Sequence, residues 1–267
     1  MAQGKGWSRD ELLLAFRLYC RTPFGRLHYR NPEIVELAKV IGRTAGSVAM
    51  KACNFASLDP AQQARGIRGL KGASEADRAL FADFLSNSEL VAAAAEEAAV
   101  RVTGQETADA VWEMPAGPTE VTRTVQARRV QGFFRSAVLA AYDNRCAISG
   151  LAVPELLNAS HIIPWSENIE RRADPRNGIC LNALYDRAFD RGLIAFDDDL
   201  RVIVSPRLKK PGVCGDAEAA LIGIEGRPLN LPRRFEPDRE AMRWHRTCRV
   251  TTEGMSSPRS LLLWDRC

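Results

Sequence analysis

The stretch from Ala159 to Leu193 limits the possible folds and functions of this chain more than any other. It contains a histidine, an asparagine and two aspartates at spacings typical of a catalytic site. His161 lies in an apolar, strand-like run, Ala-Ser-His-Ile-Ile-Pro-Trp. A half-buried imidazole in such a strand is held in one orientation and can act as a general base near neutral pH. The run therefore predicts a strand that carries a catalytic side chain.

The polar residues after His161 extend this pattern. Asn177 follows an Arg/Asp/Pro-rich loop and directly precedes Gly178, a placement typical of a tight turn. Its amide can hold either the imidazole or a neighbouring backbone strand in position. Asp186 and Asp190 are four residues apart in a segment of helical pattern, so both carboxylates project from one face. Two such carboxylates suit a hard divalent cation.

On these residues the stretch resembles an HNH endonuclease, a ββα-metal fold in which two strands and a helix hold one divalent ion. The resemblance places His161 at the general base, Asn177 at the middle asparagine and Asp186 at the last signature position, a metal ligand. Asp190 matches a position that supplies a further ligand in some branches of the family. The implied fold class is α+β, with the ββα-metal nuclease unit in the C-terminal half.

Two residues depart from the family pattern. Ser160 stands where an Asp or His ligand commonly precedes the catalytic histidine, and Tyr185 stands where close relatives often carry histidine. The remaining oxygen-rich site favours Mg²⁺ or Mn²⁺, and the resemblance leaves Zn²⁺ or Ni²⁺ open. Some relatives also carry two Cys-x-x-Cys pairs, but the seven cysteines here form none, so we predict no structural zinc.

The expected reaction is hydrolysis of a phosphodiester bond. In this mechanism His161 deprotonates a water that attacks phosphorus in line, while an ion held by Asp186 and Asp190 stabilises the leaving 3′ oxygen. Arg187 and Arg191, on the same helix, either hold neighbouring phosphates or pair with surface acids. One such centre cuts one strand, so a break in double-stranded DNA needs a homodimer or two visits.

Architecture by analogy suggests a bacterial restriction or defence endonuclease. The alternative, motivated by Ser160 and Tyr185, is a catalytically inactive DNA-binding regulator on an HNH fold; a third hypothesis is an interaction module that uses the alanine-rich helix. No apolar run approaches the length of a membrane span, and the amino terminus lacks the apolar core of a secretory signal. A cytoplasmic protein without a membrane partner is therefore expected.

The first 58 residues predict three short helices with caps at Ser8, Asn31-Pro32 and Thr44. The sequence of this segment resembles a Myb/SANT-like or homeodomain-like unit, which implies a helix-turn-helix that reads DNA. Four residues would lie on or beside the exposed face of the third helix and reach phosphates or bases: Arg43, Ser47, Lys51 and Asn54. The other interpretation is an ordinary three-helix bundle with a solvated basic face.

Charge divides the chain into segments. Residues 1–73 carry 12 Lys/Arg against 5 Asp/Glu, residues 74–120 carry 2 against 10, and residues 121–267 carry 23 against 18. Basic segments on both sides of an acidic one suit a protein that binds a phosphate backbone. We expect a helix-turn-helix domain at 1–58, a helical connector at 59–103, a linker at 104–127, a nuclease domain at 128–250 and a peripheral tail at 251–267.

The remaining expectations concern local structure. They are one helix from Ser74 to about Arg101, a basic helix from Arg128, a strand and turn at Cys146, a hairpin turn at Asp197–Asp199 and a last helix from Pro237 to Arg246. His245, in that last helix, is expected to serve packing or to lie on the surface.

Overall fold

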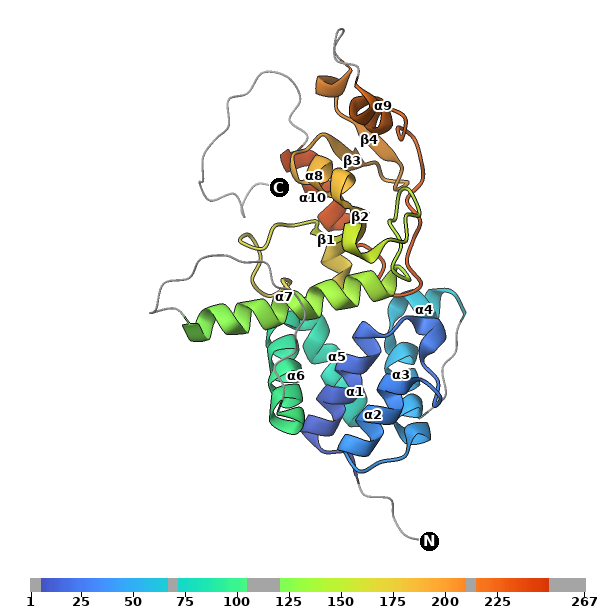
Figure 1. The fold of residues 1–267 in the computed structure, drawn as a ribbon, viewed down its shortest axis with the longest axis vertical. Helices are drawn as coiled ribbons and strands as arrows, with labels where there is room; N and C mark the ends of the chain where they lie inside the picture. The colour runs from blue at the N-terminus through green and yellow to red at the C-terminus, as the bar shows by residue number, and fades with distance from the viewer. Residues whose placement is uncertain (1–5, 67–71, 105–120, 210–214, 250–267) are drawn as a thin grey trace.

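The computed structural model describes residues 6–66, 72–104, 121–209 and 215–249. The described chain forms a helical lobe, a long helix that crosses above it, and a C-terminal lobe of small sheets and short helices (Figure 1). The predicted α+β class is confirmed. Within these ranges no helix is both long and apolar enough to cross a membrane.

The helical lobe comprises the helices that precede residue 105. They are α1 (Arg9–Arg21), α2 (Pro32–Val40), α3 (Ala45–Leu58), α4 (Pro60–Ala64), α5 (Glu75–Ser86) and α6 (Ser88–Thr103). The predicted caps are confirmed, because the side chains of Ser8, Asn31 and Thr44 accept hydrogen bonds from the first-turn amides of α1, α2 and α3.

The prediction of a single helix from Ser74 to about Arg101 is wrong, because the helix is interrupted at Asn87. The backbone of Asn87 leaves the helical region at φ −146° and ψ 86°, and its amide N–H bonds to the Asp83 carbonyl at the end of α5. Its side chain then accepts a hydrogen bond from Leu90 N, which caps α6. One residue therefore ends α5 and starts α6, and the two helices pack on each other.

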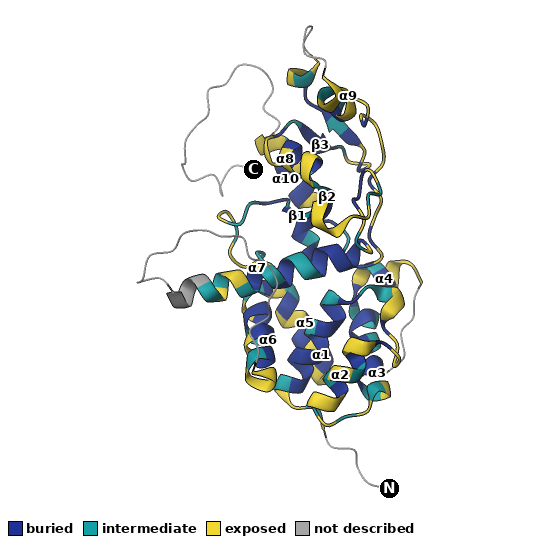
Figure 2. Cartoon of the chain, in the orientation of Figure 1, coloured by how far each residue is buried: buried dark blue, intermediate teal, exposed yellow. Residues whose placement is uncertain are grey.

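Aromatic side chains fill the centre of the helical lobe. Phe16 meets Phe55 and Phe84 edge to face, with ring centroids 5.1 and 4.9 Å apart. Phe16, Tyr19 and Phe55 are fully buried and build the core of this lobe. Figure 2 shows the buried residues concentrated on α1 and along the part of α7 that covers the lobe.

Helix α7 (Val121–Ala141) lies between the two lobes and contacts both. It packs on α1 and α6 below and on β1 and β2 above. The helix begins at Val121, so the linker expected at 104–127 ends earlier than predicted; residues 105–120 lie outside the described ranges. Phe133 contacts Phe84 of the helical lobe, whereas Phe134 faces the C-terminal lobe. One apolar core therefore continues through α7 from one lobe to the other.

In its described residues the C-terminal lobe contains two antiparallel strand pairs and three further α-helices. Its elements are β1 (Leu157–His161), β2 (Gly178–Asn182), α8 (Ala183–Asp190), β3 (Ile194–Phe196), β4 (Val202–Val204), α9 (Asp216–Ile222) and α10 (Arg239–Arg249). β1 pairs with β2, and β3 pairs with β4. β1, β2 and α8 together form the ββα unit that the sequence predicts.

Local expectations in this lobe have mixed outcomes. The hairpin turn is confirmed, because Asp197 Oδ1 accepts hydrogen bonds from the amides of Asp199 and Arg201 between β3 and β4. The strand expected at Cys146 is wrong. The turn expected there is confirmed, because Gly150 N donates to the Cys146 carbonyl at 2.8 Å.

A short segment of the C-terminal lobe inserts into the helical lobe. The fully buried Arg234 guanidinium donates to the backbone carbonyls of Tyr19, Cys20 and Thr22 at the end of α1. The next amide, Phe235 N, donates to Asp59 Oδ2 at 3.1 Å. Free carbonyls at a helix C-terminus attract cations and donors, so Arg234 caps α1 from the other lobe.

Candidate active site

The ββα unit brings the predicted residues together through its strand register. His161 pairs with Gly178 across β1 and β2, and β2 leads directly into α8, whose N-cap is Asn182. α8 packs on β1, and this contact places Asp186 beneath the outer face of that strand. Ser160 Oγ donates to Asp186 Oδ1 at 2.5 Å.

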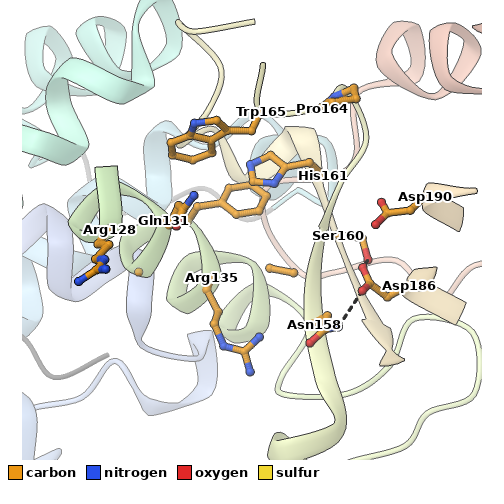
Figure 3. A pocket seen from close by; sticks show the side chains of 13 residues that line it. Arg128, Gln131, Arg135, Asn158, Ser160, His161, Pro164, Trp165, Asp186 and Asp190 are labelled. Atoms are coloured by element: carbon orange, nitrogen blue, oxygen red, sulfur yellow. Dashed lines mark hydrogen bonds between the residues drawn. The ribbon is translucent and has the colours of Figure 1, made fainter. Parts of the chain in front are cut away.

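Asn158 completes this contact. Residues two apart in a strand share one face, so Asn158 and Ser160 both point toward α8. Asn158 Nδ2 donates to Asp186 Oδ2 at 2.7 Å. Both carboxylate oxygens of Asp186 are therefore oriented by β1 (Figure 3).

His161 is held on three sides. Its ring stacks on Phe134 of α7 with centroids 3.7 Å apart and an interplanar angle of 12°. Trp165 meets it edge to face at 5.6 Å. His161 Nε2 lies 3.0 Å from the Arg172 carbonyl oxygen, which can only accept, so Nε2 carries the hydrogen. This tautomer leaves the lone pair on Nδ1, the nitrogen that a general base needs.

The same surroundings keep the imidazole neutral. Burial lowers the pKa of His161 to about 4; the hydrogen bond to the Arg172 carbonyl and the charge of Asp186 act in the opposite direction, and the Arg172 charge adds to the lowering. At neutral pH the ring is therefore in its base form.

Asn177 acts on the backbone that follows His161. It is 1% exposed, its Oδ1 accepts from Ile163 N at 2.9 Å, and its Nδ2 donates to the Ile163 carbonyl at 3.0 Å. Of the two alternatives left open by the sequence, the contact with a neighbouring backbone is the one present. Asn177 fixes the chain as it leaves β1, and thereby the direction of His161.

A cleft of about 450 Å³ opens beside His161. Figure 3 shows Ser160, Asp186 and Asp190 on one side of His161, and the α7 side chains Arg128, Gln131 and Arg135 on the other. The cleft thus has a carboxylate side and a basic side. Burial and the neighbouring Asp186 charge raise the pKa of Asp190, while nearby arginines, among them Arg187, lower it.

The carboxylate side has the chemistry of a hard-cation site. Asp186, Asp190 and the Ser160 hydroxyl all offer oxygen, and Mg²⁺ is commonly bound by one or two carboxylates together with water and substrate phosphates. Burial and, after it, the Asp186 charge raise the pKa of Asp190, and a divalent cation held by these two aspartates would offset their mutual repulsion. No cluster of three or more His, Cys, Asp or Glu suited to a metal occurs in the described ranges. The donor set fits such an ion only with ligands from solvent or substrate.

The two arginines predicted to bind phosphate from α8 lie in its last turn and at its C-cap. Arg187 and Arg191 are exposed, and neither forms an ion pair with a carboxylate in the part of the chain described here. Both charges nevertheless act on Asp190, whose pKa they lower, and phosphate binding by Arg187 and Arg191 stays a prediction.

The candidate DNA readers of the helical lobe are placed differently. The exposed position expected for Lys51 and Asn54 is wrong, since these residues are 7% and 5% exposed. Lys51 Nζ contacts Asp77 Oδ1 at 2.8 Å, and Asn54 Nδ2 donates to the Gly72 carbonyl. The sequence shows no sign of these partners, which come from distant residues.

Arg43 is also engaged inside the helical lobe. Its guanidinium bonds both carboxylate oxygens of Glu11, at 3.1 and 2.9 Å, and lies 4.2 Å from the centroid of the Trp7 ring. Ser47 is half-buried in the first turn of α3, where its amide N–H donates to the Thr44 hydroxyl oxygen at 3.1 Å. DNA binding by these residues stays a prediction, and the contacts of Arg43, Lys51 and Asn54 favour a structural role.

Comparison with known proteins agrees with the geometry. Residues 146–197 match the family model described as HNH endonuclease. This segment is similar to HNH endonuclease domains. The match covers β1, β2, α8 and β3, and so contains His161, Asn177, Asp186 and Asp190. No curated protein matches the chain.

Sequence reasoning missed several residues of the HNH site. Asn158 could have been found, because its two-residue spacing from Ser160 predicts a shared strand face. Phe134 stacks on the His161 ring, and nothing local in the sequence indicates which apolar side chain does so. The contribution of Arg172 is a backbone carbonyl, for which a sequence carries no residue-specific signal.

Proposed function

We propose that this chain is a divalent-metal-dependent DNA endonuclease in which His161 is the general base. The observation that carries the proposal is the fixed imidazole. Nε2 is committed to the Arg172 carbonyl, so Nδ1 is the nitrogen able to take a proton, and the ring borders the same cleft as Asp186 and Asp190. The HNH match independently implies a nuclease acting on DNA.

The chain's own residues would perform the reaction as follows. His161 accepts a proton from water at Nδ1 as that water attacks phosphorus, and the Phe134 stack keeps the ring plane fixed during the transfer. Ser160 and Asn158 hold the Asp186 carboxylate in one orientation, and Asp190 supplies the second negative charge. A divalent ion bound by these aspartates would stabilise negative charge on the phosphate and the leaving oxygen.

Phosphate binding would come from both sides of the cleft. Arg128, Gln131 and Arg135 lie on one face of α7, at helical spacings of three and four residues, and line the cleft. Arg187 and Arg191 add positive charge at the end of α8. These residues support a DNA backbone that runs across α7 and α8, next to His161. Three of the four predicted readers in the helical lobe, Arg43, Lys51 and Asn54, have partners inside that lobe instead.

A restriction or defence role is part of this proposal and rests on architectural analogy. A second candidate is the inactive DNA-binding regulator. One observation favours it: both oxygens of Asp186 already accept hydrogen bonds from β1, and Ser160 provides no charge at the first ligand position.

Cleavage of supercoiled plasmid separates the two candidates. Wild type would be compared with His161→Ala in Mg²⁺, Mn²⁺ or EDTA, on methylated and unmethylated DNA. The exposed His28 provides a matched control, His28→Ala. Metal-dependent nicking that is lost in His161→Ala and kept in His28→Ala supports the enzyme. Binding of both DNAs without cutting in any metal favours the regulator.

A further inference from the structure

The loop that fixes His161 is attached to the helical lobe. This loop, residues 164–174, joins β1 to the turn before β2, and its Arg172 carbonyl accepts from His161 Nε2. Within the loop, Arg172 Nε donates to the Trp165 carbonyl at 2.7 Å, and the guanidinium lies 5.0 Å from the Trp165 ring centroid. Arg172 thus contacts the imidazole through its carbonyl and also holds Trp165, the other loop residue that contacts the imidazole.

The first turn of α6 holds this loop from the other lobe. Ser88 N and Ser88 Oγ both donate to the Glu170 carbonyl, at 3.0 and 2.8 Å. Helices leave their first amides without internal partners, so the first amide of α6 is available for this bond. Glu89 Oε2 lies 3.6 Å from Arg172 Nη1, and these side chains are 26% and 21% exposed, which limits solvent screening.

We infer that Ser88 and Glu89 are positioning residues that set the tautomer and direction of His161 through Glu170 and Arg172. We refer to these four residues as the interlobe contact. The helical lobe is then a structural part of the active site, and not only a targeting unit. This inference rests on the proposed function, since it concerns the same histidine.

The hydrogen bond that fixes His161 tolerates little displacement of the loop. The His161 hydrogen bond is 3.0 Å long and the Glu170 carbonyl is two residues from Arg172, so a displacement of the loop by about 1 Å takes the bond beyond useful geometry. Without a carbonyl at Nε2, neutral imidazole divides between its two tautomers, and the one with hydrogen on Nδ1 cannot accept the proton. General-base catalysis typically contributes about 10²–10⁴-fold in rate, so a base in the wrong tautomer loses part of that factor.

The test combines kinetics with a direct probe of the tautomer. The double variant Ser88→Ala/Glu89→Gln is expected to lower kcat about tenfold or more with KM nearly unchanged, because the bound substrate meets a misoriented base. Ser88→Thr keeps the hydroxyl and should retain activity. Glu97→Gln, on the same helix, removes only an exposed pair with Arg101 and is the matched control.

Nitrogen-15 NMR of histidine provides a readout that does not need cleavage. The chain has 3 histidines, so selective labelling gives few signals, and His161→Ala assigns one of them. His245 serves as internal reference, since its Nε2 bonds to the Phe189 carbonyl within the C-terminal lobe. In the double variant the His161 signals should shift toward a tautomer mixture, while those of His245 stay unchanged.

The outcomes are distinguishable. If the double variant keeps the wild-type His161 signals, the inference is overturned, even where the thermal midpoint or KM changes. If wild type cuts no DNA but the His161 signals still respond to the double variant, the positioning inference stands and the proposed endonuclease activity fails.

Discussion

Gly178→Ala tests the placement of α7 against the active-site strands. Gly178 has extended backbone, with φ −138° and ψ 149°, so alanine meets no conformational penalty there. A Cβ at this position would lie 2.5 Å from Val138 Cγ2 and 2.7 Å from Phe134 Cζ. Ordinary carbon contacts are about 3.5–4.0 Å, so α7 must retreat by roughly 1 Å or the Phe134 ring must turn.

Both responses cost stability and disturb His161. Forcing an extra methyl into a packed interior typically costs about 1–3 kcal/mol. For a chain of this size a loss of about 2 kcal/mol lowers Tm by roughly 4–8 °C. Because Phe134 is the ring on which His161 stacks, we also expect cleavage to fall by more than the loss of folded protein explains.

The assay is calorimetric or circular-dichroism melting, with plasmid cleavage at a temperature where both proteins are folded. Gly46→Ala is the matched control: Gly46 lies in the first turn of α3, and an added Cβ would meet no heavy atom within 4 Å. Alanine should stabilise it by about 0.5–1 kcal/mol. An unchanged Tm and cleavage rate in Gly178→Ala would refute the described contact between α7 and β2.

Three further predictions concern charge. Lys51→Met leaves the buried Asp77 carboxylate without its partner and should reduce the free energy of unfolding by about 3–5 kcal/mol in urea titration, whereas Arg101→Met, at an exposed pair, should change it by less than about 1 kcal/mol. Burial lowers the pKa of His245 from 6.5 to about 4, so between these pH values the unfolded chain binds more protons than the folded chain. The contribution of neutral His245 to the free energy of unfolding is therefore fully present above pH 6.5 and falls by roughly 3 kcal/mol as the pH falls toward 4. This loss should be smaller in His245→Phe. For cleavage, the pKa of His161, lowered to about 4, predicts that kcat/KM keeps its value from neutral pH down to about pH 5, and an acidic limb centred near pH 6.5 would contradict the buried base.

The sequence predicted the elements whose signals are local. Ser8 and Thr44 predict the starts of α1 and α3, because each capping side chain lies three residues before the amide that donates to it. The grouping of His161 with Asp186 was also predictable, since the ββα unit is short and its spacing is specific.

Contacts between distant segments were not predictable in this way. The helical pattern predicts an exposed position for Lys51. Nothing near it in the sequence indicates that Asp77, on another helix, lies beside it. Asn87 interrupts a segment of high helical propensity. It caps both α5 and α6, which pack on each other, and helix propensity takes no account of such packing. The Arg172 carbonyl depends on how a loop folds, and any residue type would supply it.

Arg234 has a consequence for how such a protein can be inherited and rearranged. Its buried guanidinium belongs to one lobe and its carbonyl partners, at the end of α1, belong to the other. A recombination event that exchanged either lobe alone would leave a buried charge facing the wrong surface, at a cost that marginal folding stability does not tolerate. The two lobes should therefore descend together as one heritable unit, and chimaeras joined within the linker should express poorly unless the receiving helix also accepts this arginine.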